Sequence, residues 1–195
     1  MYNHNRILEF NFLNEGDHIL ASSDNTNLKL LKAFSELLKV TNFDQIKVSD
    51  LVKEAQLSRQ SFYNHYRSKE DFLRESILVI FDDITKILNN NLLYDKVILQ
   101  EMLNYIYINR EIIKPLVSYF PNIDNIIIDY IKDMIIHSEI PNLEKQLEIA
   151  YQVPYKFAFD IYILSIKSII LNWINNGFTE TPEKIAKYIS IVVKI

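Results

Sequence analysis

The sequence predicts an all-α fold, on three observations. Apolar residues recur at three- and four-residue intervals through most of the chain, which is the spacing of helices with one buried face. The 195 residues include only two glycines and five prolines, so the residues that form the tight turns between strands are nearly absent. The hydrophobic share of 49% is ample for a buried core. At 195 residues the chain could form one large domain or a small domain plus a larger one. The segments described below lead us to expect a small three-helix domain followed by a larger helical one.

The chain begins with a segment that shows no sustained period. We expect residues 1–23 to form a loosely packed extension. An arm that reaches DNA or a partner subunit is the alternative, and Arg6 is the only Lys or Arg in it. Asp24 or Asn25 can then cap a first helix that runs to about Val40, because Asp and Asn side chains accept hydrogen bonds from free amides at helix starts.

Two short helices joined by a tight turn follow within residues 46–73. The first has an apolar face made by Val48, Leu51, Val52 and Ala55. Ser58 stands at the N-cap position of the second, where its hydroxyl can accept a hydrogen bond from the amide of Ser61. The second helix should run from Arg59 to about His65. Two helices around such a turn are the arrangement of a DNA-binding helix-turn-helix.

The outward-facing side chains of this motif suit contacts with DNA. Arg59 and Gln60 have flat ends that can bind a guanine or adenine edge bidentately in the major groove. Tyr63, His65 and Lys69 suit phosphate oxygens. On helical spacing alone, a solvated helix face is the alternative. The residues that we predict to contact DNA are Lys47, Ser49, Ser58, Arg59, Gln60, Ser61, Tyr63, Asn64, His65 and Lys69.

The run LSRQSFYNHYRSKEDF, residues 57–72, resembles the N-terminal domain of the TetR family of bacterial transcription regulators. Within that family it is similar to the branch of dihydroxyacetone-operon activators. The resemblance is strong over residues 28–77. It implies a DNA-binding domain over residues 24–76, which binds double-stranded DNA at a palindromic operator. It also implies a dimerisation and effector-binding domain over residues 77–195, and repression relieved by a ligand as the commonest logic.

Three residues depart from the family pattern. Asn42 stands where the family usually has Gly after the first helix, and Asn tolerates the left-handed conformation of a helix C-cap. Gln56 replaces a frequent turn Gly, which leaves the backbone geometry of the turn open. Lys47 replaces a frequent Thr and exchanges a hydroxyl contact for a charge. None of these changes removes the expectation of DNA binding.

Ser68 should start a fourth helix of about twenty residues that couples the first domain to the rest of the chain. Pro115 would interrupt a short later helix, and Gly177 is a natural residue to follow a helix end. The later helices are expected at about residues 95–109, 111–118, 122–138, 142–151, 155–176 and 182–193.

The segment from Phe157 to Trp173 is apolar nearly all round, so it must be buried on several sides, either in a core or in a subunit interface. In the TetR family the last two helices pair into a four-helix dimer interface, and the resemblance implies the same here. Two-fold symmetry suits half-sites about one helical turn apart, roughly 34 Å. The expected interface residues are Phe157, Ile161, Leu164, Ser168, Leu171, Ile185, Tyr188, Ile189 and Val192.

The C-terminal half is rich in aromatic residues, and relatives in the family commonly bind a small effector between these helices. A cavity lined by Tyr and Phe would suit an apolar or aromatic ligand. The candidates for its lining are Tyr105, Tyr130, His137 and Trp173. For any single one of the aromatic candidates, ordinary core or interface packing is the favoured interpretation. His137 lies beside Asp133 and Glu139, but one such group predicts no metal site, and we expect no cofactor.

Charge and missing motifs narrow the function classes. The sequence has no Gly-rich phosphate loop, cysteine nucleophile or G-x-S-x-G, so we expect no enzyme. The longest charge-free stretch, residues 168–179, is too short to span a membrane, and the N-terminus is no secretory signal, so a cytoplasmic protein is expected. Residues 24–76 hold nine Lys/Arg and eight Asp/Glu, which is no basic patch. An interaction module or co-regulator that acts through a protein partner, with weak or lost DNA binding, is therefore the alternative function.

Overall fold

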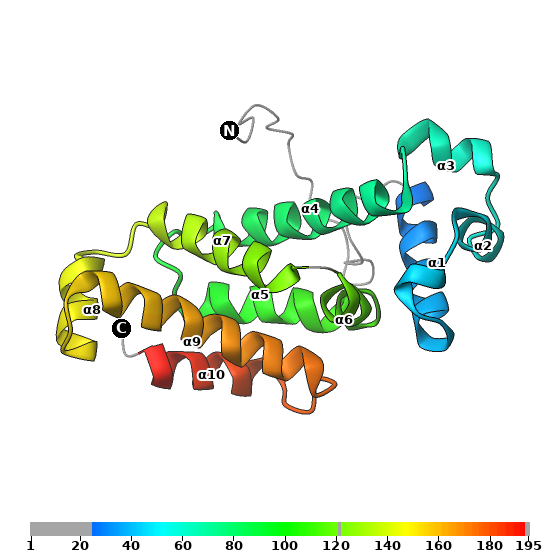
Figure 1. Ribbon diagram of the computed structural model, residues 1–195. Coiled ribbons are helices and arrows are strands. Elements are labelled where there is room, and N and C mark those ends of the chain that lie inside the picture. Colours follow the sequence, from blue (N-terminus) through cyan, green and yellow to red (C-terminus); the bar gives the residue numbers. More distant parts are fainter. Residues whose placement is uncertain (1–24, 121, 194–195) are drawn as a thin grey trace.

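The computed structural model describes residues 25–120 and 122–193 and is shown in Figure 1. The described residues form ten α-helices and one short 3-10 helix without any strand, which confirms the all-α prediction. The elements in chain order are α1 Asn25–Val40, η1 Phe43–Gln45, α2 Val48–Glu54, α3 Arg59–His65, α4 Lys69–Leu88, α5 Lys96–Ile108, α6 Arg110–Tyr119, α7 Ile123–Ile136, α8 Leu143–Tyr151, α9 Tyr155–Asn175 and α10 Pro182–Val193. The predicted extension over residues 1–23 lies outside the described residues.

The first three helices and the start of α4 pack around a core of aromatic rings. Phe72 of α4 lies edge-on to Phe34 of α1 and to Phe62 of α3, in each case with 6.1 Å between ring centroids. Tyr66, directly after α3, packs on the same Phe72 ring at 5.2 Å. The three phenylalanines are at most 1% exposed. This cluster fixes α3 relative to α1 and α4.

The long helix α4 leaves this group and continues into the C-terminal bundle (Figure 1). Its inner face is buried along its length by Phe72, Ile77, Ile80, Ile84 and Leu88. In the bundle α10 packs on α5 and α9, and α9 also contacts α6, α7 and α8. The expected domain border between residues 76 and 77 therefore falls inside one continuous helix.

Helix α6 lies close to the expected residues 111–118 and runs through Pro115 without interruption, although we expected this residue to interrupt it. Proline has no N–H to donate to the carbonyl four residues earlier, which belongs to Glu111. The hydroxyl of Ser35 on α1 donates to that carbonyl instead. Ser35 is only 4% exposed, so the bond forms a buried polar link between the N-terminal helices and the bundle.

The backbone conformation of three turn residues can be compared with expectation, and two of them, Gln56 and Asn42, are departures from the family pattern. Gln56 has a φ of 55° and takes the left-handed conformation where relatives have Gly, so the turn between α2 and α3 is kept. Asn42 has a φ of −73° and is extended, because it leads directly into η1; the expectation of a left-handed cap there was wrong. Gly177 ends α9 with a φ of 78°, as expected.

Among the described residues, one helix is long and apolar enough to cross a membrane by length and composition alone, and it is α9. A core helix of a soluble protein passes the same test. In this structure α9 packs on α6, α7, α8 and α10, and 33% of its most apolar window is buried.

Candidate nucleic-acid interface

Helix α3 is held by its ends and by one buried ring. The Ser58 hydroxyl accepts a hydrogen bond from the Ser61 amide at 3.0 Å, which confirms the predicted N-cap. Phe62 is fully buried, and it is the only residue of α3 in that class. The opposite face of the helix is therefore free to meet another molecule.

The predicted contact residues of α3 lie on that free face. Tyr63 is 56% exposed, and Ser61 is half-buried. Ser58, Arg59, Gln60, Asn64 and His65 are also exposed. The arrangement presents a guanidinium, an amide and a phenol on one short helix, which are groups that bind base edges and phosphates.

The two predicted residues before the turn lie at the start of α2. Asp50 accepts a hydrogen bond from the Lys47 amide at 3.1 Å, and its other oxygen lies 3.4 Å from the Ser49 hydroxyl. Lys47 is exposed and Ser49 half-buried. Arg67, in the turn between α3 and α4, is exposed as well, and its amide donates to Asp71 at 2.8 Å. The sequence-based list omitted Arg67, although the same criterion, a basic residue beside α3, would have included it.

Lys69 is the exception among the predicted DNA contacts. Its ammonium donates to the carbonyl of Phe43 at 2.7 Å and lies 4.1 Å from the centroid of the Phe43 ring. The residue is 9% exposed. The DNA contact of Lys69 stays a prediction. In this structure its side chain lies inward over η1, with its ammonium on the Phe43 carbonyl and ring.

We expect Lys69→Met to destabilise the N-terminal helices by about 1–3 kcal/mol, because it removes a hydrogen bond from a charged donor and a cation–π contact. Urea unfolding followed by circular dichroism measures this, with the exposed Lys53→Met as control. Unchanged stability together with a weaker salt dependence of DNA binding would instead make Lys69 a phosphate contact.

The aromatic candidates for an effector pocket are engaged in the bundle. The Tyr105 hydroxyl donates to Asp83 at 3.0 Å, and both residues are buried. Burial, reinforced by the charge of Asp83, raises the pKa of Tyr105, so the phenol stays protonated and remains a donor. The Tyr130 hydroxyl lies 2.8 Å from the Thr85 hydroxyl, and its ring stacks on Phe81 with centroids 4.2 Å apart.

Trp173 and His137 differ in burial. Trp173 is 2% exposed, and its indole N–H donates to the Glu180 carbonyl at 2.9 Å. His137 follows the end of α7, with its side chain 70% exposed and Nδ1 2.8 Å from the Asp133 carbonyl. Neither of two hollows in this structure is lined by Tyr105, Tyr130, His137 or Trp173. The four candidates are thus not gathered around one of those hollows.

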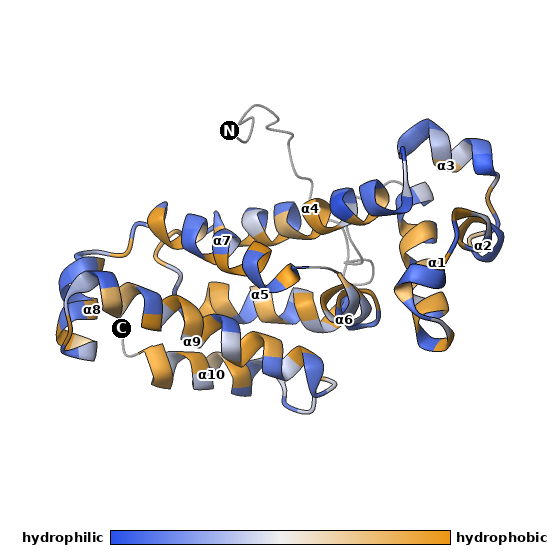
Figure 2. Cartoon of the chain, viewed as in Figure 1, coloured by the Kyte–Doolittle hydropathy of each residue, from blue (hydrophilic) through white to orange (hydrophobic). Residues whose placement is uncertain are grey.

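The last two helices carry an exposed apolar surface, which we call the α9–α10 face. Figure 2 shows how far hydrophobic residues dominate these helices. The exposed members are Phe157, Ile161 and Leu164 of α9, and Tyr188, Ile191 and Val192 of α10. On α9 the row continues with the exposed Ser168 and the half-buried Leu171.

Two of the predicted interface residues are placed differently. Ile185 and Ile189 are 3% and 4% exposed within the single chain, because α10 turns them towards α5 and α9. They are core residues of the protomer rather than outward-facing ones. Ile191, which the sequence-based list omitted, is 60% exposed instead.

Comparison with known proteins supports this architecture at both ends of the chain. Residues 30–76 match the family model described as bacterial regulatory proteins, tetR family, and residues 96–194 match the model described as transcriptional regulator C-terminal region. The HTH-type dhaKLM operon transcriptional activator DhaS of Lactococcus lactis subsp. lactis (strain IL1403) is 32% identical over 62 residues. That match covers 32% of this chain and 32% of the relative, so it spans about a third of the length of the curated protein.

A solved structure of similar fold is titled dihydroxyacetone kinase operon activator DhaS. It superposes with a TM-score of 0.59 and 22% sequence identity, and the match covers 87% of this chain and 95% of the other. At this identity the likeness concerns the fold alone.

Proposed function

Because this chain belongs to the TetR family of bacterial transcription regulators, we propose that it works as a homodimer that binds a palindromic operator and responds to a small molecule. Members of this family are soluble DNA-binding regulators, not enzymes. We place this one in the cytoplasm. Repression relieved by the small molecule is the mode that we propose, and activation, which the name of the relative DhaS gives for that protein, is the alternative.

The observation that carries the proposal is the exposed face of α3. A buried Phe62 anchors the helix from behind, and the side chains of Arg59, Gln60 and Tyr63 point away from the core. A short helix with this composition can enter the major groove and read a few base pairs. One such helix gives little specificity, which is why a second copy related by two-fold symmetry is part of the proposal.

The α9–α10 face supports the dimer. Exposed apolar residues on two adjacent helices form a surface that a monomeric soluble protein rarely leaves open to water. A second copy of the same face would cover it and produce a four-helix interface. The same geometry would set the spacing between the two α3 helices.

For the effector we propose the seam between α4 and α7. Of the fourteen residues of α7, only Ile135 is buried, although half of them are isoleucine. Phe81 and Tyr130 stack across the seam. A thinly covered helix of this kind can move to admit a small apolar or aromatic molecule. Differential affinity of that molecule for the two helix positions would then change operator binding.

Substituting Arg59 or Gln60 by Ala tests the α3 assignment. Each change should cost about 1–3 kcal/mol of specific binding and relax the preference at one base pair. Fluorescence anisotropy with the operator and with a shuffled duplex measures both effects. Lys145→Ala on the distant α8 removes a charge as a control and should leave both affinities unchanged. Equal losses on operator and shuffled DNA would count against base reading.

The interaction-module alternative makes a different prediction about salt. Specific DNA binding should weaken steeply between low and moderate salt because phosphate contacts release counterions. Binding of a protein partner through an apolar helix face should change little over the same range. Residues 24–76 carry nearly equal numbers of basic and acidic residues, so charge alone does not decide between the two functions, and the salt dependence does.

A further inference from the structure

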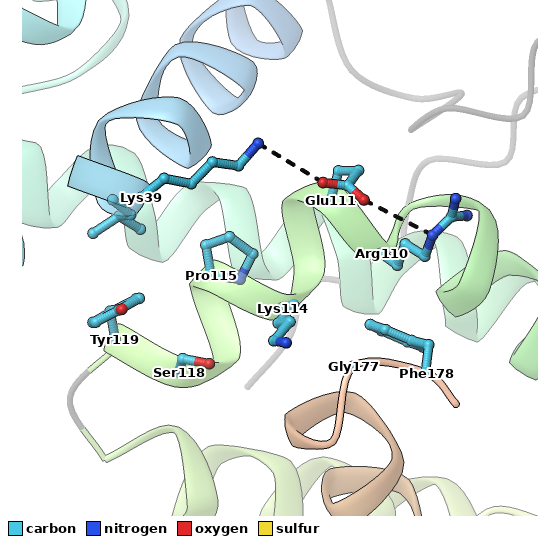
Figure 3. Close-up of a pocket in the computed structure, with 10 residues that line it drawn as sticks. Lys39, Arg110, Glu111, Lys114, Pro115, Ser118, Tyr119, Gly177 and Phe178 are labelled. Atoms are coloured by element: carbon cyan, nitrogen blue, oxygen red, sulfur yellow. Dashed lines mark ion pairs between the residues drawn. The ribbon is translucent and has the colours of Figure 1, made fainter. Parts of the chain in front are cut away.

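A hollow of about 370 Å³ lies where the end of α1 meets α6 and the turn after α9 (Figure 3). Lys39 reaches into it from α1, Arg110 and Lys114 from α6, and Phe178 from the turn. Its volume is within the range of small-molecule sites in proteins. The hollow is separate from the seam between α4 and α7, because none of its lining residues belongs to those two helices.

Positive charge exceeds negative charge in this hollow. Three cationic side chains line it against one carboxylate, that of Glu111. The carboxylate is shared: Lys39 Nζ and Arg110 Nε each lie 3.9 Å from one of its oxygens. Lys39 has a second and closer partner outside the hollow, Glu36, at 2.7 Å. Arg110 also lies 4.7 Å over the ring of Tyr107.

Of the three cations that line the hollow, Lys114 has no carboxylate partner among the described residues, 25–120 and 122–193. Its ammonium instead lies beside the backbone of Gly177, 3.5 Å from where a Cβ of that residue would stand. The adjacent end of α9 offers only the partial negative charge of its last carbonyl groups. An ammonium in this position is available to a ligand with a full negative charge.

The remaining lining is mostly apolar, with the hydroxyls of Ser118 and Tyr119 as its polar groups. Gly177 and Phe178 both have positive φ, of 78° and 60°, which returns the Phe178 amide to the Trp173 carbonyl at 2.9 Å. This turn holds Phe178 at the hollow, and Pro115 lines it from α6. A ligand body without charge would therefore find an aromatic ring and a proline ring beside the cations.

We propose that this hollow binds a small organic anion, with a phosphate or carboxylate group at Lys114 and Arg110 and an apolar body against Phe178 and Pro115. Hydrogen bonds between cationic side chains and such oxyanions are among the strong ones in proteins. Lys39 of α1 lines the same hollow, so an anion that also contacts Lys39 would join α1 to α6, beside the bond from Ser35 to the Glu111 carbonyl. Any change that this link makes in operator affinity rests on the proposed function, whereas binding of the anion does not.

Isothermal titration of the full-length protein with phenyl phosphate tests the site. We expect one phenyl phosphate per chain, inorganic phosphate at least about 10-fold weaker for lack of the apolar body, and no binding of phenol. Lys114→Gln should weaken phenyl phosphate about 10-fold or more. Lys145→Gln, a matched change on α8, should have no effect. Lys39→Gln, at an exposed position, is a second variant that should also weaken binding.

Two results would overturn the proposal: no heat of binding at millimolar phenyl phosphate, or equal affinities in Lys114→Gln and Lys145→Gln with unchanged melting temperatures. Operator binding is measured separately by anisotropy, with and without phenyl phosphate. Anion binding without any operator binding would support this site and contradict the proposed function. Operator binding without anion binding would support the proposed function and contradict the anion site.

Discussion

Replacing Leu164 by Asp is expected to separate the proposed dimer into monomers and to weaken operator binding by about a thousandfold. Leu164 is 47% exposed in the middle of the α9–α10 face, between Ile161 and Ser168 along the helix. In a two-fold interface the same residue comes from both chains, so one substitution buries two unpaired carboxylates in apolar surroundings. A monomer would keep only one half-site contact.

Sedimentation equilibrium measures the mass of the variant, and anisotropy measures its operator affinity. Val97→Asp is the matched control, because Val97 is 63% exposed on α5 and lies outside the α9–α10 face. The control should remain a dimer with full affinity. A Leu164→Asp protein that still sediments as a dimer would show that another surface joins the chains.

The second large effect concerns the support of α3. Phe62→Ala should lower the stability of the N-terminal helices by about 3–5 kcal/mol, the usual cost of truncating a buried Phe. Phe62 is fully buried, and its ring packs on Tyr66 at 5.5 Å as well as on Phe72. A loss of this size is comparable to the whole stability of a small domain, so α3 would lose its fixed position and operator binding would disappear.

Urea unfolding followed by circular dichroism gives the change in stability. Tyr63→Ala serves as the comparison, because Tyr63 neighbours Phe62 but is 56% exposed. It should cost less than about 1 kcal/mol of stability while weakening DNA binding. A Phe62→Ala protein as stable as the parent would contradict the packing described for the aromatic cluster.

Features set by local sequence could be predicted. The N-caps at Ser58 and Ser68 depend on an amide three residues away, and both accept the expected hydrogen bond, at 3.0 and 3.1 Å. The helix periods and the end of α9 at Gly177 are local in the same sense. These features together with the family resemblance were sufficient to obtain the fold class and the candidate recognition helix.

Features that depend on residues far away in the sequence could not be predicted. Lys69 turns inward because the Phe43 carbonyl, 26 residues away, lies within its reach. Pro115 is tolerated inside α6 because Ser35, on another helix, donates to the free carbonyl. No sequence pattern around Lys69 or Pro115 signals these contacts. The hollow beside Lys114 could not be predicted either, because its walls come from three separate segments of the chain.

Helical spacing also cannot distinguish a face turned to the protomer's own core from a face turned to a partner. The spacing placed Ile185 and Ile189 of α10 together with Tyr188 in one predicted interface. In the structure the two isoleucines face α5 and α9, while Tyr188 and Ile191 face outward. Only the packing of the neighbouring helices decides which side of α10 is covered.

The most direct test of the account is selection of bound sequences from a random duplex library by the purified full-length protein. The account predicts enrichment of a palindrome with half-sites about one helical turn apart, roughly 34 Å, bound by two chains with steep salt dependence. Absence of any enriched sequence at low salt, with Arg59 and Gln60 intact, would contradict operator recognition through α3 and favour a regulator that acts through a protein partner.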